Sequence, residues 1–236
     1  MRPMSKAPGD TPEFDFQRSL KSSSPRGLLR FVQFDRYVNR RLAALIARAA
    51  SRTGLRPNHL TVAAFAVSVA GALFYLRGDH AGFIVAGLLI YLSTILDGAD
   101  GMLARSKNLC TRFGAYLDLY LDRITDYLVM GAMATGYYLQ SGRHVFYILS
   151  LFGLGAYMLQ TLLYYLEREF RRIQTGSGAS GEFRGLVYLG ILVFSLIDRL
   201  DLVIIILLCV PVLNIIYRFI RFWVIERPEE APPPSP

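Results

Sequence analysis

Six long apolar segments fill the chain from residue 60 onward, and they restrict the possible fold more than any other feature. The segments are Leu60–Leu76, Ala81–Leu96, Gly114–Leu139, Val145–Leu166, Phe183–Ile197 and Leu202–Ile225. Most approach the length of about 20 residues with which a helix crosses the hydrocarbon of a bilayer. Open strands would leave backbone groups unpaired in lipid, so segments of this kind are expected to be helices. The sequence therefore predicts an all-α membrane protein with six transmembrane helices.

The composition agrees with a membrane protein but adds an unusual charge. Of the 236 residues, 53% are hydrophobic and 19% are charged, whereas about a quarter of a typical soluble domain is charged. This excludes an intrinsically disordered chain, which would be poor in aromatic residues. The net charge is nevertheless +8. Such a charge suits nucleic acid or anionic lipid, and its distribution along the chain distinguishes the two.

The basic residues gather on one side of the predicted membrane. If the segments alternate in direction, the opposite side keeps only Arg77, Arg143 and Arg199, one in each connecting loop. This asymmetry is the positive-inside pattern and predicts that both termini are cytoplasmic. The positive charge then serves topology and lipid contact rather than nucleic acid. Residues 1–24 are polar and show no apolar core of a signal peptide.

The N-terminal part divides at a helix that is expected to lie on the membrane. Val38, Leu42 and Leu45 recur at helical spacing, and arginines occupy most of the other positions. This pattern predicts an amphipathic helix in the cytoplasmic interface. From the N-terminus, the predicted parts are a disordered cytoplasmic stretch (1–26), the interfacial amphipathic helix (27–56), a six-helix transmembrane domain (57–226) and a disordered Pro-rich tail (227–236).

Four aspartates lie where lipid would not tolerate them. Asp97 and Asp100 are three residues apart at the cytoplasmic end of the second segment. Asp118 and Asp122 are four residues apart about one turn inside the third. Each spacing puts a pair on one helix face. Since a short loop joins the two segments, we expect antiparallel neighbours whose four carboxylates converge just below the cytoplasmic surface.

Such a cluster needs neutralising charge. An ionised acid inside a span costs several kcal/mol, and neighbouring like charges raise that cost. The divalent cations Mg²⁺ and Mn²⁺ take oxygen ligands and also accept substrate phosphates, and two of them could clamp a diphosphate. Gly98 and Gly101 would leave room for the ligand, and Arg105 would add a cation for a phosphate. The four aspartates are therefore predicted metal ligands.

Other interpretations remain open at this point. The acids could line a cation pathway, although transport sites usually lie near the midplane or along a pore. The chain could also be a non-catalytic membrane scaffold. Asp126 continues the Asp118/Asp122 stripe and lies three residues from Arg123. We predict that Arg123 and Asp126 form a structural ion pair.

The spacing of the acids resembles the signature of a known family. The run Asp97-x2-Asp100-Gly101-x2-Ala104-Arg105-x8-Gly114-x3-Asp118-x3-Asp122 is similar, at every specified position, to that of the CDP-alcohol phosphotransferases. The Pro57-Asn58-x2-Thr61 segment and the predicted helices also look like that family, so the resemblance covers about residues 27–225. It implies transfer of a substituted phosphate from a CDP-alcohol to an acceptor hydroxyl, with release of CMP, in phospholipid or related lipid synthesis.

The resemblance also implies roles for individual residues. Asp97, Asp100 and Asp118 would be metal ligands, and Asp122 would share the metal site and act as general base. The CDP moiety would be bound by Asn58, Thr61, Asp100, Gly101, Ala104, Arg105, Thr111 and Gly114. The expected cofactor is Mg²⁺ or Mn²⁺, two ions per site. Residues 57–226 would be the catalytic domain, in a prokaryotic cell membrane with the active site on the cytoplasmic side.

The substrates and the assembly stay less defined. The donor could be CDP-diacylglycerol, with glycerol phosphate, inositol phosphate or serine as acceptor, or a soluble CDP-polyol or CDP-amino-alcohol. Arg168 and Arg184 are candidate ligands for a phosphorylated acceptor, or simply positive-inside charges. The segments Tyr120–Arg123 and Glu182–Leu186 look similar to an archaeal branch that uses inositol phosphate, without fixing the substrate. A homodimer is common in the family, and Gly131, Ala132 and Gly136 are predicted positions of close helix approach.

Overall fold

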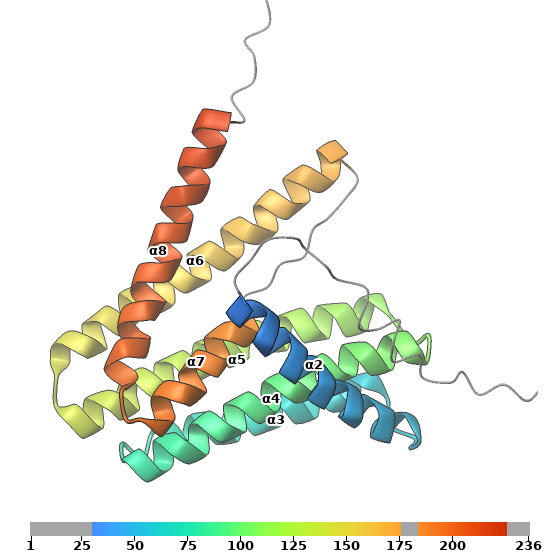
Figure 1. Cartoon of the computed structure of the whole chain (residues 1–236), viewed down its shortest axis with the longest axis horizontal. Helices are drawn as coiled ribbons and strands as arrows, with labels where there is room; N and C mark the ends of the chain where they lie inside the picture. Colours follow the sequence, from blue (N-terminus) through green and yellow to red (C-terminus); the bar gives the residue numbers. More distant parts are fainter. Residues whose placement is uncertain (1–29, 176–183, 226–236) are drawn as a thin grey trace, which may run out of the picture.

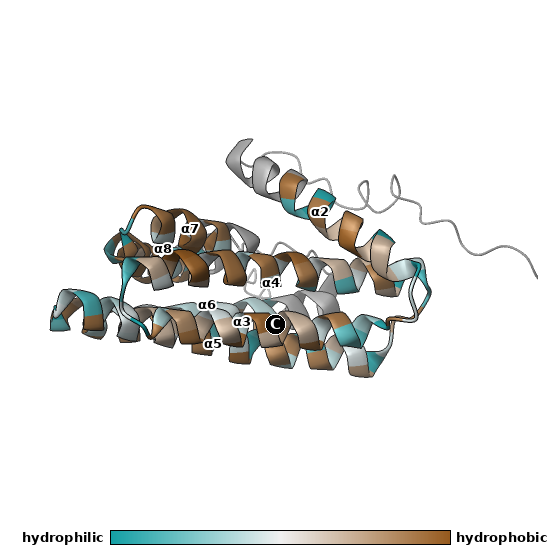
Figure 2. Ribbon diagram, turned by 90° about the horizontal axis from the view of Figure 1, so that it is seen from below, coloured by the Kyte–Doolittle hydropathy of each residue, from teal (hydrophilic) through white to brown (hydrophobic). Residues whose placement is uncertain are grey.

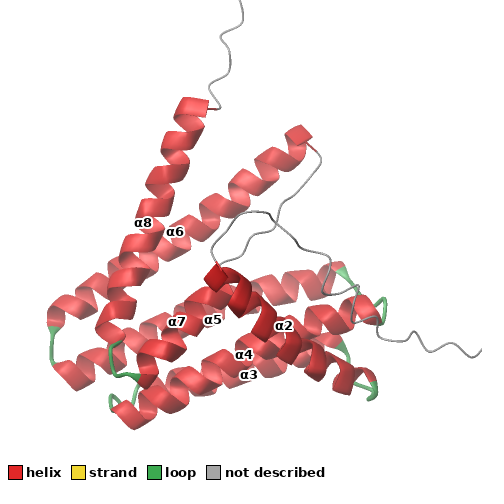
Figure 3. Ribbon diagram, viewed as in Figure 1, coloured by secondary structure: helices red, strands yellow, loops and turns green. Residues whose placement is uncertain are grey.

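Helices joined by short loops make up the parts that the structure describes, residues 30–175 and 184–225 of a computed structural model, and no strand occurs in them (Figures 1 and 3). The helices are α2 (Arg30–Ser51), α3 (Pro57–Tyr75), α4 (His80–Ser106), α5 (Arg112–Ser141), α6 (His144–Thr175), α7 (Arg184–Leu196) and α8 (Leu200–Ile225). The predicted all-α fold is confirmed. The predicted disordered ends, 1–26 and 227–236, lie outside the described residues.

The helix boundaries follow from local capping, with one difference from the prediction. Pro57 occupies the first turn of α3, where its missing N–H costs nothing. The Asp79 side chain accepts a hydrogen bond from the Gly82 N–H and begins α4. α4 then continues to Ser106, so the predicted end at Leu96 is wrong. The continued ladder of backbone hydrogen bonds keeps Asp97 and Asp100 on a helix face.

Four of the described helices are long and apolar enough to cross a membrane, namely those spanning Pro57–Tyr75, His80–Ser106, His144–Glu167 and Leu200–Ile220. The described apolar part of α7, Val187–Leu196, is shorter. α5 is more polar because acids occupy its first half. Figure 2 shows the hydrophobic residues running along α4, α7 and α8, and the hydrophilic ones at the connecting loops.

The helices form two groups that share one core. α3 packs against both α4 and α5, and α6 packs against α8 and α5, with α7 lying against α4 and α8. In Figure 1, α6 and α8 lie close together near the loops and diverge toward their far ends. The two groups meet around large, fully buried side chains, which include Tyr75, Phe83, Ile90, Met133, Ile191 and Ile204. The expectation that α4 and α5 are direct neighbours needs correction, because they do not form an extensive contact with each other. Instead, α3 packs against each of them.

α2 has two apolar faces rather than one. Ala43, Ala44, Ala47 and Ala50 are buried in a cluster with Ile95, Ala99, Met102 and Leu103 of α4. The Tyr91 hydroxyl donates a hydrogen bond of 2.5 Å to the Asn39 side chain and fixes the same contact. Leu42 and Leu45 of the predicted apolar face are instead 38% and 62% exposed. A face of alanines thus attaches α2 to α4, while the larger side chains point outward.

Close approach of α5 to α3 gives a test of the packing. A Cβ atom on Gly136 would lie 2.0 Å from the Tyr75 carbonyl oxygen, whereas one on Gly131 would meet nothing within 4 Å. We expect Gly136→Ala to lower the free energy of unfolding by about 1–3 kcal/mol, because the backbone of α5 or of Tyr75 would have to move to make room. Thermal unfolding in detergent measures the change.

Gly131→Ala is the matched control on the same helix. It adds the same methyl group to open space, and alanine favours the helix by up to about 1 kcal/mol over glycine. Its melting temperature is therefore expected to equal or exceed that of the wild type. Equal melting temperatures for both variants would contradict the predicted contact between α5 and α3.

Candidate metal centre

Three of the four predicted acids meet at one point. Asp97 and Asp100 come from the last turns of α4, and Asp118 comes from the second turn of α5. One carboxylate oxygen from each lies within 4.8 Å of the others. Asp100 is buried, and Asp97 and Asp118 are partly buried. The three-residue spacing of Asp97 and Asp100 thus presents two carboxylates of α4 to a third from α5.

A third helix orients the most buried of these acids. The Thr61 hydroxyl of α3 donates a hydrogen bond of 2.5 Å to Oδ2 of Asp100, and both side chains are buried. This bond fixes one carboxylate oxygen and leaves the other to a ligand. Partners of this kind orient metal ligands and tune their affinity. Thr61, which the resemblance implies as a CDP ligand, therefore lies beside the predicted metal ligands.

The chemistry of the three acids fits a hard divalent cation. All the donor atoms are carboxylate oxygens, which suit Mg²⁺ and Mn²⁺ better than Zn²⁺. Like charges this close oppose one another, and burial of Asp100 adds the cost of lost hydration. A bound cation removes both costs. Asp97, Asp100 and Asp118 are the residues that could hold it.

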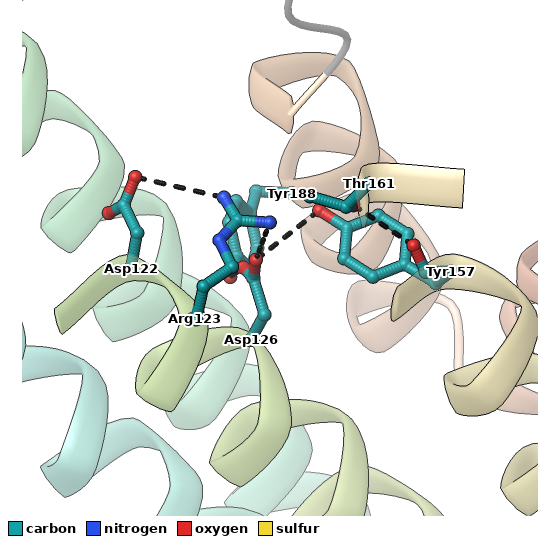
Figure 4. A network of polar contacts seen from close by, with 6 residues as sticks. All are labelled: Asp122, Arg123, Asp126, Tyr157, Thr161 and Tyr188. Atoms are coloured by element: carbon teal, nitrogen blue, oxygen red, sulfur yellow. Dashed lines mark hydrogen bonds and ion pairs between the residues drawn. The ribbon is translucent and has the colours of Figure 1, made fainter. Parts of the chain in front are cut away.

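Asp122 stands slightly apart from this group. Its Oδ2 lies 3.9 Å from the Arg123 guanidinium, and Figure 4 shows the carboxylate facing that side chain. Asp122 and Asp97 both line a small cavity of about 20 Å³ between α3, α4 and α5. The fourth acid is therefore close to the first, but it is not one of the three residues whose oxygens converge.

Hydroxyl groups that the sequence analysis did not single out line the same small cavity. They belong to Ser68, Ser93, Thr94 and Thr125, and they lie beside the predicted Thr61. Ser68 and Ser93 also bond to carbonyl oxygens of their own helices, as serines in apolar helices commonly do. Ser68 in addition contacts Thr125 of α5 at 3.3 Å. Only the convergence of three helices distinguishes these residues from ordinary helix serines and threonines.

The start of α5 brings together three residues predicted to contact CDP. The Thr111 hydroxyl accepts a hydrogen bond of 2.9 Å from the Gly114 N–H and caps the helix. A Cβ on Gly114 would lie 3.1 Å from Oδ1 of Asn58 and 3.1 Å from Thr111 Oγ1. Gly114 therefore allows the first turns of α3 and α5 to approach. Thr111 has a capping role that the sequence did not reveal.

The end of α4 carries the other predicted residues, with one correction. Gly101, Ala104 and Arg105 lie within about one turn, and a Cβ on Gly101 would be 3.3 Å from the Arg105 guanidinium. Gly98 was expected to leave room for a ligand, but it faces α2, where its Cβ would lie 3.3 Å from that of Ala43. The side chains of Arg168 and Arg184 lie outside the described residues.

A second, larger cavity lies between α6, α7 and α8. It measures about 300 Å³, and much of its wall is aliphatic and aromatic. Its polar lining includes Arg123, Gln160, Asn214 and Arg218. Oε1 of Gln160 is buried without a hydrogen-bond partner among the described residues. Arg123 therefore lies both on the wall of this cavity and beside Asp122.

Thr61 offers a test of the metal centre that does not depend on catalysis. Thr61→Val removes the hydroxyl that orients Asp100 but keeps the shape of the side chain. We expect Mn²⁺ affinity to fall by about 10- to 100-fold. Titration followed by electron paramagnetic resonance measures free Mn²⁺ directly. Thr135→Val is the control, since Thr135 bonds only a carbonyl of its own helix in the described contacts. Equal affinity of both variants would contradict the assignment.

Comparisons with known proteins find a matching family and several related proteins. A family model described as CDP-alcohol phosphatidyltransferase matches residues 55–211. Archaetidylinositol phosphate synthase of Pyrococcus horikoshii is 32% identical over 92 residues, which are 39% of this chain and 47% of that protein. Phosphatidylinositol phosphate synthase of Streptomyces avermitilis is 35% identical over 106 residues, 44% of this chain and 42% of that one. The chain thus matches less than half of the length of each of these two relatives.

Solved structures extend the likeness to the fold. Mycobacterium tuberculosis phosphatidylinositol phosphate synthase with CDP-DAG bound has a TM-score of 0.62 at 24% identity, covering 80% of this chain and 100% of that chain. The same protein in complex with manganese and citrate has a TM-score of 0.61 at 25% identity, covering 77% of this chain and 89% of that chain. The helical arrangement is therefore shared over most of both proteins.

Proposed function

The chain belongs to the CDP-alcohol phosphatidyltransferase family, and we propose that it transfers a substituted phosphate from a CDP-alcohol to an acceptor hydroxyl, releasing CMP. The observation that carries the proposal is the convergence of Asp97, Asp100 and Asp118, whose ligand atoms lie within 4.8 Å of one another. Asp122 lies on the next turn of α5, close enough to share a small cavity with Asp97. Residues 57–226 form the catalytic domain in this proposal.

The metal site provides the first part of the mechanism. Asp97, Asp100 and Asp118 would hold Mg²⁺ or Mn²⁺, and Asp122 would help to hold a second ion. The metal would supply positive charge to neutralise the diphosphate. Thr61 keeps Asp100 in the orientation for this role. The neighbour that contains manganese supports the choice of metal. The CDP moiety contacts the residues around the ends of α4 and the starts of α3 and α5, namely Asn58, Thr61, Asp100, Gly101, Ala104, Arg105, Thr111 and Gly114.

Asp122 provides the general base. Its carboxylate accepts the proton of the acceptor hydroxyl while that oxygen forms a bond to the phosphorus distal to cytidine. The bond from this phosphorus to the bridging oxygen breaks, and the electron pair leaves with CMP. The attack is in line, so nucleophile and leaving group occupy opposite sides of the phosphorus. The position of Asp122 just outside the group of three acids supports this division of roles.

For the substrates, we propose CDP-diacylglycerol as donor and inositol phosphate as acceptor. The names of the relatives and the CDP-DAG in a structural neighbour support this choice. The cavity between α6, α7 and α8 supports a polar acceptor, because Arg123 and Arg218 lie on its wall. Gln160 also presents a carbonyl oxygen that has no hydrogen-bond partner among the described residues. Arg168 and Arg184 are further candidates for binding the acceptor phosphate.

We place the protein in a prokaryotic cell membrane as six spans, α3–α8, with both termini and the acid cluster on the cytoplasmic side and a homodimer as the assembly. The four long apolar helices support a location in the membrane. The gathering of Lys and Arg residues on one side of the predicted membrane supports the orientation. The outward Leu42 and Leu45 support α2 as the interfacial helix.

A CMP-release assay tests the proposed function. The purified protein in detergent with Mg²⁺ or Mn²⁺ is offered CDP-diacylglycerol or soluble CDP-glycerol, with inositol phosphate, glycerol phosphate or serine. We expect CMP only with CDP-diacylglycerol and inositol phosphate, and only with metal present. Release with another pair would overturn the proposed substrates. Absence of CMP with every pair would overturn the reaction, and cation flux in proteoliposomes would then indicate a transporter.

A further inference from the structure

One buried carboxylate beside the proposed base is bound by three helices. Asp126 of α5 has 0% of its side chain exposed. Its Oδ1 accepts a hydrogen bond from the Tyr188 hydroxyl of α7, and its Oδ2 accepts one of 3.5 Å from Tyr157 of α6. Nη1 of Arg123 lies 3.0 Å from the same Oδ2 (Figure 4). The predicted ion pair is thus confirmed, and it is part of a larger network.

Arg123 connects this network to Asp122. Nη1 of its guanidinium faces Asp126, and Nη2 lies 3.9 Å from Oδ2 of Asp122. A guanidinium group is planar and rigid, so a bond that fixes one of its nitrogens also fixes the direction of the other. The position of the charge next to Asp122 is therefore set by Asp126, and the position of Asp126 by two tyrosines.

Asp122 lines a small cavity together with Asp97, so a bound cation could attract its carboxylate as well. Asp122 is outside the group of converging oxygens, and its carboxylate faces Arg123 instead. A buried ion pair also costs desolvation that apolar residues would avoid. The hydroxyls of Tyr157 and Tyr188 offset part of that cost by donating hydrogen bonds to Asp126. Asp126 lies one turn of α5 beyond Asp122, next to the proposed site. The geometry favours a role in orienting Asp122 over a role in stability alone.

We propose that Asp126, held by Tyr157 and Tyr188, is a positioning residue that fixes Arg123 and thereby orients Asp122 toward the acceptor hydroxyl. This inference rests on the proposed function. It predicts that damage to the network lowers the rate of the chemical step and leaves donor binding and metal binding unchanged. A network that only stabilises the fold would change the melting temperature without changing the rate.

The experiment compares variants of the full-length protein by CMP release, Mn²⁺ titration and thermal unfolding. For Asp126→Asn we expect kcat to fall by about 10- to 100-fold, the usual cost of losing an outer partner of a site. The KM for CDP-diacylglycerol and the Mn²⁺ affinity should stay within about twofold, because only the transition state is affected. Tyr188→Phe should lower kcat by about fivefold, the loss of one net hydrogen bond.

Arg123→Lys and Arg123→Gln test the charge. Lysine keeps the positive charge but not the planar guanidinium group that contacts both aspartates. Arg123→Lys should therefore retain more of the wild-type kcat than Arg123→Gln does. Tyr75→Phe is the matched control for Tyr188→Phe, because it removes a buried hydroxyl bonded to Ser195 at 2.7 Å in the core. It should lower the melting temperature and leave kcat unchanged.

The outcomes separate this inference from the proposed function. If the wild type releases CMP and both Asp126→Asn and Tyr188→Phe keep its kcat, only the inference is overturned. Weaker binding of the Mn²⁺ ion held by Asp97, Asp100 and Asp118 would overturn it too, as would a rise in the KM for CDP-diacylglycerol, because the position of Asp122 affects neither. If the wild type releases no CMP with any pair, the proposed function fails and the inference fails with it. Tyr188→Phe removes a single oxygen, so it decides the question even if Asp126→Asn does not fold.

Discussion

Asp122→Asn is expected to lower CMP release by about 100- to 10,000-fold, the contribution of a well-placed general base. Asparagine has nearly the same shape as aspartate, but its amide cannot take a proton from the acceptor hydroxyl. Asp97, Asp100 and Asp118 keep their convergence without it. Binding of CDP and of the Mn²⁺ ion held by these three acids should therefore change little, whereas the ion that Asp122 shares should bind more weakly. Single-turnover CMP release, Mn²⁺ titration and CDP binding measured on the same sample separate these effects.

A matched change elsewhere controls for the loss of one acid. Asp79 begins α4 at the far end of that helix and pairs with Arg77 at 2.9 Å. Asparagine is also a good N-cap residue, so Asp79→Asn should leave both fold and turnover intact. Wild-type turnover in Asp122→Asn would show that another group takes the proton. A loss of turnover caused entirely by lost Mn²⁺ would instead make Asp122 a metal ligand and not the base.

Asp100→Asn is expected to abolish both metal binding and CMP release. Asp100 is the most buried of the three converging acids and receives the Thr61 hydrogen bond, so a neutral amide there removes a ligand at the centre of the site. The Mn²⁺ affinity should fall by more than the factor of about 100 that marks the loss of an outer partner. Wild-type protein stripped with a chelator should show the same loss, and added Mn²⁺ or Mg²⁺ should restore it.

Asp201→Asn controls for this second change. Asp201 lies at the start of α8 and pairs with Arg199 at 3.0 Å on an exposed surface. Exposed ion pairs contribute about 0–1 kcal/mol, so this variant should bind Mn²⁺ and release CMP as the wild type does. Metal binding by Asp100→Asn at wild-type affinity would place the cation elsewhere and remove the main support of the proposed reaction.

Much of this arrangement could be predicted because it depends on local spacing. The apolar segments marked the helices, and the intervals between Asp97 and Asp100 and between Asp118 and Asp122 put each pair on one face. The end of α4 was placed too early, because a polar turn at a membrane surface has the composition of a loop. The residue pair Arg123 and Asp126 was predictable for the same reason as the acids, since both lie on one helix.

Contacts between distant helices could not be predicted in this way. Tyr157 and Tyr188 lie 31 and 62 residues along the chain from the aspartate they bond. In the sequence, each looks like an ordinary aromatic residue of an apolar helix. The packing of α3 against both α4 and α5 is likewise a tertiary contact. The sequence indicated that something packs closely against Gly98, but not whether this is a ligand or another helix. In the structure it is Ala43 of α2.

The order of the helices along the chain has a consequence for biosynthesis. A nascent chain synthesised as far as α5 already carries every acid of the cluster, yet both tyrosines that bond Asp126 follow later, on α6 and α7. Until those helices arrive, the membrane or the insertion machinery must accommodate a carboxylate that lacks two of its donors. Completion of the contacts to Asp126 therefore depends on α6 and α7, and a chain truncated after α5 would lack both tyrosines.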